Sequence, residues 1–158
     1  MTGRSTVTAV TALLAAVAFT LSACSGDQVE TKPEADVNAA VQKHANAIAA
    51  VAGQALQNPK VRAGGCTDPN ENVSDSVYTV QGVYTLPAPA AGEKHLDVIA
   101  KVRDDWKAKG YTITDDRTVA ADRGVAAART PDGYKLDIET GDPRGFAVFV
   151  DSPCYARP

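Results

Sequence analysis

The C-terminal part of the chain alternates short apolar stretches with turn sequences, and this pattern constrains the fold most. Strand candidates lie at residues 111–114, 124–129, 134–140 and 146–151. The turn sequences TPDG (130–133) and GDPRG (141–145) separate the last three of them. In the stretch YKLDIET (134–140), apolar and charged residues alternate. Such alternation is typical of an antiparallel sheet with one buried and one solvated face. The pattern therefore predicts an antiparallel meander.

Two helices and one more strand are predicted upstream of the meander. Apolar residues recur at helical spacing between Pro33 and about residue 56, and again over residues 93–109, where Gly110 suits a helix end. The stretch VYTVQGVYTL (77–86) is rich in β-branched and aromatic residues and predicts a strand, whereas residues 62–76 predict a loop. The order α-β-α-β-β-β-β favours an α+β fold. We expect a two-layer sandwich with two helices on a mainly antiparallel five-stranded sheet.

The N-terminal segment has the layout of an export signal. It carries one basic residue, Arg4, then an apolar run from residue 7 to residue 21, then small residues. The sequence Leu21-Ser22-Ala23-Cys24 ends it and resembles the lipobox of bacterial lipoproteins, in particular the small cell-envelope lipoproteins of actinobacteria. An ordinary cleaved signal would not require a cysteine at the next position, and a retained anchor needs roughly 20 apolar residues, more than this run supplies.

The lipobox resemblance implies where the protein resides. It implies that residues 1–23 are removed as a signal peptide and that Cys24 receives a diacylglyceryl anchor and a palmitate-type chain on the extracytoplasmic face of the cell membrane. Polar residues 24–33 are then expected to form a tether, and residues 34–158 a single domain. The chain has 16 Lys and Arg against 19 Asp and Glu. This mildly acidic balance gives no electrostatic reason to bind nucleic acid, so the membrane is reached through the lipid.

The same resemblance bears on how the three cysteines of the chain are used. With Cys24 reserved for lipid, Cys66 and Cys154 form an even pair in an oxidising compartment, and neither has a second Cys or His at metal-ligand spacing. We therefore predict a Cys66–Cys154 disulfide. It closes a loop of roughly 90 residues, which is worth on the order of 4 kcal/mol by the chain-entropy argument. It also requires the last strand to end beside the start of the first.

No catalytic or cofactor motif is recognisable. His44 falls on the apolar stripe of the first predicted helix, where a boundary or core role is expected. His95 lies near Glu93 and Asp97, but no nucleophile elbow accompanies it. The stretch DPNENV (68–73) starts like a calcium loop, yet Val73 stands where glycine is required. We expect no metal and no cofactor.

The other charged groups predict no site. Asp115, Asp116 and Asp122, with arginines among them, are expected to flank the second strand as a solvated edge. Arg129 and Arg144 are isolated basic residues that define no patch. The adjacent carboxylates Asp104 and Asp105 would point in different directions on a helix, so they make no acid–base pair.

Three functions remain open at this stage. The leading hypothesis is a non-enzymatic lipoprotein domain that binds an envelope protein or a small ligand. The alternative is a carrier of a lipid or other hydrophobic ligand, for which small residues such as Ala126 and Ala128 would leave a cavity. An envelope hydrolase is the third. An exposed aromatic patch with Tyr78, Tyr84 or Phe149 would favour the first.

Overall fold

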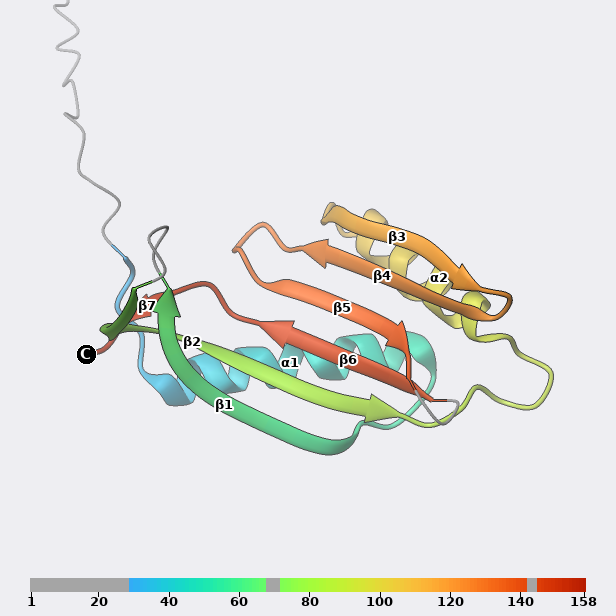
Figure 1. Ribbon diagram of the computed structural model, residues 1–158, viewed down its shortest axis with the longest axis horizontal. Coiled ribbons are helices and arrows are strands. Elements are labelled where there is room, and N and C mark those ends of the chain that lie inside the picture. The colour runs from blue at the N-terminus through green and yellow to red at the C-terminus, as the bar shows by residue number, and fades with distance from the viewer. Residues whose placement is uncertain (1–28, 68–71, 142–144) are drawn as a thin grey trace, which may run out of the picture.

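The protein is an α+β sandwich with both helices on one face of the sheet, as predicted (Figure 1). The computed structural model describes residues 29–67, 72–141 and 145–158. The helices are α1 (Glu34–Ala52) and α2 (His95–Ala108). The strands are β1 (Gln57–Thr67), β2 (Val73–Leu86), β3 (Thr112–Ala120), β4 (Arg123–Arg129), β5 (Lys135–Thr140), β6 (Phe146–Asp151) and β7 (Tyr155–Ala156). No helix among these residues is long and apolar enough to cross a membrane.

The sheet runs in the order β1-β2-β6-β5-β4-β3, and every neighbouring pair is antiparallel. The short strand β7 pairs with the start of β2. All five expected strands are present, and two more join them, β1 and β7. The predicted loop at residues 62–76 was wrong at both ends, because residues 57–67 form the edge strand β1 and β2 already begins at Val73. An edge position tolerates Pro59 and the two glycines of this strand, since only one side needs a full set of ladder hydrogen bonds.

The helices end where glycine permits a left-handed turn. Gly53 has φ +69°, and its N–H contacts the carbonyls of Ala49 and Ala50, so α1 stops at Ala52, earlier than the expected residue 56. Gly110 has φ +75°, and the N–H of Tyr111 then bonds the Trp106 carbonyl, which closes α2. A glycine at the C-terminal end of each helix thus sets how far that helix extends over the sheet.

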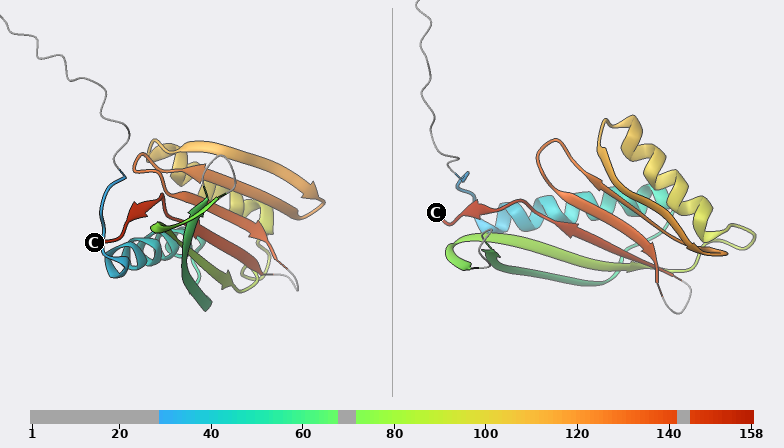
Figure 2. Two further views of the ribbon diagram at one scale, coloured as in Figure 1. Left: turned by 60° about the vertical axis from the view of Figure 1, so that its left-hand side comes forward. Right: turned by 45° about the horizontal axis from the view of Figure 1, so that its top comes forward.

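Small residues bring the helices close to the sheet. α1 contacts β2 and β6, and α2 contacts β3, β4 and β5 (Figure 2). A Cβ atom at Gly82 of β2 would lie 2.5 Å from Cγ1 of Val41, and one at Gly124 of β4 would lie 2.7 Å from Cδ2 of Leu96. Ala126 and Ala128 are fully buried in the same layer. At these positions the small residues therefore serve close packing.

Both ends of the described chain meet at one end of the sheet. The N–H of Lys32 bonds the Ala156 carbonyl, the N–H of Ala156 bonds the Glu30 carbonyl, and Thr31 forms a parallel bridge with Ala156. The hydroxyl of Tyr78 donates to the Lys32 carbonyl at 2.8 Å. Residues 30–32, which the sequence placed in a tether, are thus bound to the domain. Figure 1 shows the chain entering beside the C-terminus.

Candidate functional site

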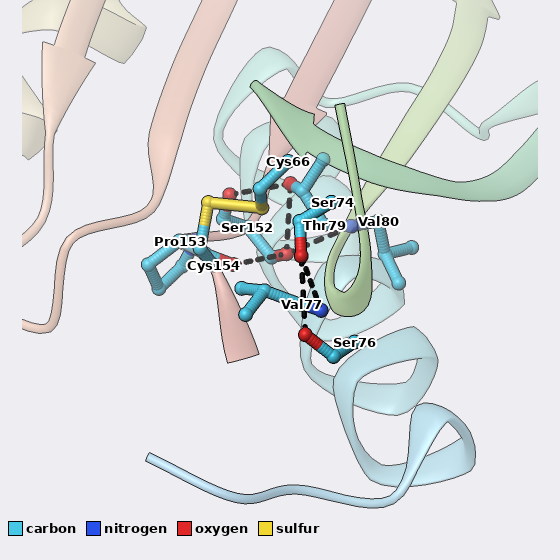
Figure 3. The surroundings of a disulfide bond; sticks show 9 residues. All are labelled: Cys66, Ser74, Ser76, Val77, Thr79, Val80, Ser152, Pro153 and Cys154. Carbon is cyan, nitrogen blue, oxygen red and sulfur yellow. Dashed lines mark hydrogen bonds between the residues drawn. A yellow bond between two sulfur atoms is a disulfide. The ribbon is translucent and has the colours of Figure 1, made fainter. Parts of the chain in front are cut away.

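A disulfide between Cys66 and Cys154 ties β1 to the segment that follows β6, which confirms the predicted pairing (Figure 3). The two Cα atoms are 6.1 Å apart, within the usual range for such a bridge. Buried Ser152 fixes the same segment to β2, because its Oγ accepts from the Val80 N–H at 2.9 Å and its carbonyl accepts from the Thr79 hydroxyl at 2.8 Å. As the prediction required, the chain after β6 runs back to the start of β2.

The face of the sheet opposite the helices is not covered by any described element, and we call it the open face (Figure 2). Its central row follows from the strand register: Val83 lies opposite Phe149, Phe149 opposite Asp137, and Asp137 opposite Ala127. All four residues are half-buried. The centre of the open face is therefore apolar apart from one carboxylate.

That carboxylate, Asp137, is poorly solvated. Its Oδ1 is buried without a hydrogen-bond partner. Burial, together with the neighbouring carboxylates of Glu139 and Asp115, raises the pKa of Asp137 to about 6. At neutral pH the Asp137 carboxylate is therefore charged, and this charge lowers the stability of the folded state.

At the disulfide end of the open face lies a hollow of about 580 Å³. It is lined by Gly65, Cys66, Thr67, Thr79, Arg129, Gly133, Lys135, Asp151, Ser152, Pro153 and Cys154. We call it the disulfide hollow. A smaller hollow of about 380 Å³ adjoins it, where Arg62 donates to Gln81 and Gln81 donates to Asp151.

Arg129 and Lys135 are directly opposite each other across the β4–β5 hairpin. The sequence interpretation of Arg129 as an isolated cation was therefore wrong. The turn at residues 130–133 indicates that the two strands are neighbours, but a four-residue turn would place position 129 opposite 134, so the pairing of 129 with 135 is known only from the register of the structure. The other basic residue, Arg144, lies outside the described residues.

The opposite end of the open face has a groove of about 630 Å³. Its walls come from the start of β1, the end of β2 and the hairpin between β5 and β6, with Gln57, Thr85, Glu139 and Phe146 among its lining residues. Among the described residues that line this groove, Glu139 is the only charged one. Sequence reasoning missed this groove because it depends on β1.

His95 stabilises the start of α2. Its Nδ1 lies 2.8 Å from Oδ2 of Asp122, and its ring packs on Phe146 with the centroids 5.2 Å apart. The other carboxylate oxygen of Asp122 accepts from the Leu96 N–H at 3.4 Å. Hydrogen bonds from His95 and this N–H hold the pKa of Asp122 below its usual range. Asp122 therefore caps a helix whose own N-cap residue, Lys94, provides no side-chain bond.

The remaining sequence candidates are explained by packing or ion pairs. The His44 ring contacts Tyr134 at 4.7 Å between centroids, and burial lowers the pKa of His44. Tyr78 and Tyr84 are fully buried on the helix side, so of the three aromatic candidates only Phe149 lies on the open face.

Of the three acidic residues expected to flank the second strand, two lie within it, whereas Asp122 follows it in the turn before β4. Asp115 and Asp116 are part of β3, where Asp115 pairs with Arg117 and Asp116 pairs with Arg103 of α2. Asp104 also pairs with Arg103, whereas Asp105 pairs with Lys109, so the two adjacent carboxylates act separately.

Cys24 and most of the calcium-like stretch, residues 68–71, lie outside the described residues. Within residues 29–67, 72–141 and 145–158, no group of three or more His, Cys, Asp or Glu side chains is arranged to hold a metal ion. Comparison with protein-family models, with curated proteins and with solved structures finds no match for this chain.

Proposed function

We propose that the protein is an extracytoplasmic lipoprotein, anchored through a lipid on Cys24, whose domain is a non-enzymatic binding module. The observation that carries the proposal is the Cys66–Cys154 disulfide. It engages both other cysteines of the chain and leaves Cys24, directly after the small residues of the lipobox, as the thiol available for acylation. Disulfides persist mainly in oxidising compartments, which agrees with export.

The open face supports a binding role for the domain. Antiparallel sheets often leave one face to solvent, but here that face has an apolar centre, Val83 and Phe149, between two hollows. A mixed surface of this kind, with apolar groups inside a polar rim, is typical of protein and ligand contacts. A carrier of hydrophobic ligands is less well supported, because Gly82 and Gly124 bring helices and sheet into direct contact.

Acylation is tested by producing the full chain in a bacterial host that is fed an alkyne analogue of palmitate. The wild-type chain is expected in the membrane fraction with label attached, and the Cys24→Ser variant without it. The matched control is the double variant Cys66→Ser/Cys154→Ser, which removes the other thiols and should keep the label. Label retained by Cys24→Ser would contradict the proposed anchor.

Binding through the open face is tested with a photoreactive amino acid placed at residue 83 or 149 in living cells. Ala47, which is exposed on the solvent side of α1, provides the control position. Discrete cross-linked products are expected from the sheet positions and not from position 47. Equal patterns from all three positions would contradict use of the open face.

A further inference from the structure

Two cations face each other in the disulfide hollow, and one carboxylate, Asp151 of β6, lies opposite Lys135 on its other side. Arg129 of β4 and Lys135 of β5 are cross-strand partners, and neither forms an ion pair within the described parts of the chain. Like charges directly opposite each other destabilise a sheet. An anion bound between them would remove that repulsion.

The walls of the hollow leave its net charge positive. Asp151 is its acidic lining residue, and its Oδ1 already accepts a hydrogen bond from Gln81 at 2.9 Å. Arg129 and Lys135 thus outnumber the carboxylates of the hollow, on a chain whose net charge is −3. The guanidinium of Arg129 can contact two oxygens of a phosphate, and the ammonium of Lys135 supplies a second charge.

The hollow lies at the end of the sheet where the chain leads toward Cys24. Ala156 binds the segment at residues 30–32 and lies opposite Val77 of β2. Asp151, the neighbour of Lys135, lies opposite Gln81, four residues further along the same strand. At the usual rise and spacing of strands, Lys135 is about 14 Å from Ala156. The chain between Cys24 and Glu30 extends at most about 20 Å. A lipid on Cys24 would therefore hold the disulfide hollow within reach of the headgroup layer.

We propose that the disulfide hollow binds the phosphate of an anionic phospholipid, with Arg129 and Lys135 as the contacts. This inference rests on the proposed lipid anchor. Binding would hold the domain with its disulfide end at the membrane, and the groove of about 630 Å³ at the other end of the sheet would face away from it.

The test uses the acylated protein, purified from membranes and placed in nanodiscs of phosphatidylcholine alone or with 30 % phosphatidylglycerol (on the order of natural anionic content). Amide hydrogen exchange is measured by mass spectrometry. The β4–β5 hairpin is expected to be protected only in the anionic nanodiscs. Each cation near an anionic surface contributes a factor of about five. Arg129→Gln and Lys135→Gln should each reduce the protection about fivefold, and raising the salt concentration should reduce it as well.

Arg123→Gln is the matched control. Arg123 lies at the other end of the same strand and on the same face as Arg129, so its loss should leave the protection unchanged. Melting temperatures measured without lipid separate binding from folding. Arg129→Gln relieves its repulsion with Lys135 and should not lower them, whereas Lys135→Gln also removes the charge opposite Asp151 and should leave them nearly unchanged.

Each result decides the question. Equal protection in both nanodiscs, or equal losses for Arg123→Gln and Arg129→Gln, overturns the phosphate site. If inorganic phosphate added to the phosphatidylcholine nanodiscs reproduces the protection, the site binds free phosphate and the lipid assignment is overturned. The mass of the N-terminal peptide is read in the same samples. An acylated peptide without headgroup-dependent protection overturns the site alone, and an unacylated peptide overturns the proposed anchor.

Discussion

Replacing Gly82 by alanine tests how tightly α1 packs on the sheet. The added Cβ would lie 2.5 Å from Cγ1 of Val41 and 2.7 Å from Cε2 of Tyr84. Carbon atoms pack at about 3.5–4.0 Å, so α1 and the Tyr84 ring would each have to move by about 1 Å. Overpacking of this kind costs about 1–3 kcal/mol. At about 3 °C per kcal/mol, the melting temperature should fall by about 3–9 °C.

A double-mutant cycle assigns this cost to the helix contact. Val41→Ala removes the clashing methyl group and alone should cost about 2 kcal/mol, because Val41 is fully buried. The double variant Gly82→Ala/Val41→Ala should be more stable than the sum of the single effects by at least about 1 kcal/mol. Urea denaturation monitored by circular dichroism measures all four proteins.

Gly64→Ala is the matched control for the glycine change itself. Gly64 lies in β1 with no atom within 4 Å of its built Cβ, so this substitution should be neutral or slightly stabilising. If Gly82→Ala is as harmless as Gly64→Ala, the layer between α1 and the sheet has room to spare. The close-packing argument would then be refuted, and a ligand cavity at this place would become the better explanation.

Three further predictions concern cross-links and charges. Cys66→Ala/Cys154→Ala should lose about 4 kcal/mol in urea denaturation, because the bond closes a long loop; a loss below 1 kcal/mol would contradict this. Since burial raises the pKa of Asp137 to about 6, its charge destabilises the fold above that pH, and the wild type should gain stability relative to Asp137→Asn as the pH falls from 7 to 4. Asp137→Asn should be about 1 kcal/mol more stable at pH 7.5, after allowing for partial solvent screening, and an unchanged difference from pH 7.5 to 4 would refute the reasoning. Conversely, the lowered pKa of Asp122 means that Asp122→Asn should reduce the melting temperature at pH 7 by about 2 °C. That effect should shrink as the pH falls below the ordinary range of a carboxyl group and Asp122 of the wild type becomes protonated, and an effect of the same size at every acidic pH would contradict the capping role.

The parts of the fold that sequence predicts are those in which local signals agree with tertiary packing. The helices, the two hairpin turns and strands β2, β4, β5 and β6 combine a clear period with turn or cap residues. The two edge strands were harder to predict from the sequence. β1 (Gln57–Thr67) contains proline, asparagine and glycine, and β3 (Thr112–Ala120) has three consecutive charged residues at its centre. Both are held mainly by backbone bonds to one neighbour, and such bonds leave little trace in side-chain composition.

The candidate site was less predictable for a related reason. The disulfide followed from counting cysteines, but the disulfide hollow needs the register of β4 against β5 and the position of β1. Arg129 and Lys135 are unremarkable as single residues and become a pair only through the hairpin. Tyr78 and Tyr84 were correctly placed on one strand face. Which face the helices cover depends on long-range packing that the sequence pattern does not fix.

The docking of residues 30–32 on β7 also determines how the domain would bear a mechanical load. Tension that enters the chain ahead of Glu30 passes through the backbone bonds to Ala156, two residues beyond Cys154. From there it spreads through the disulfide into β1 and through the strand pairing into β2. α1 starts only after this junction, so a pull at the N-terminus would strain the cross-linked end of the sheet before it could unwind the helix.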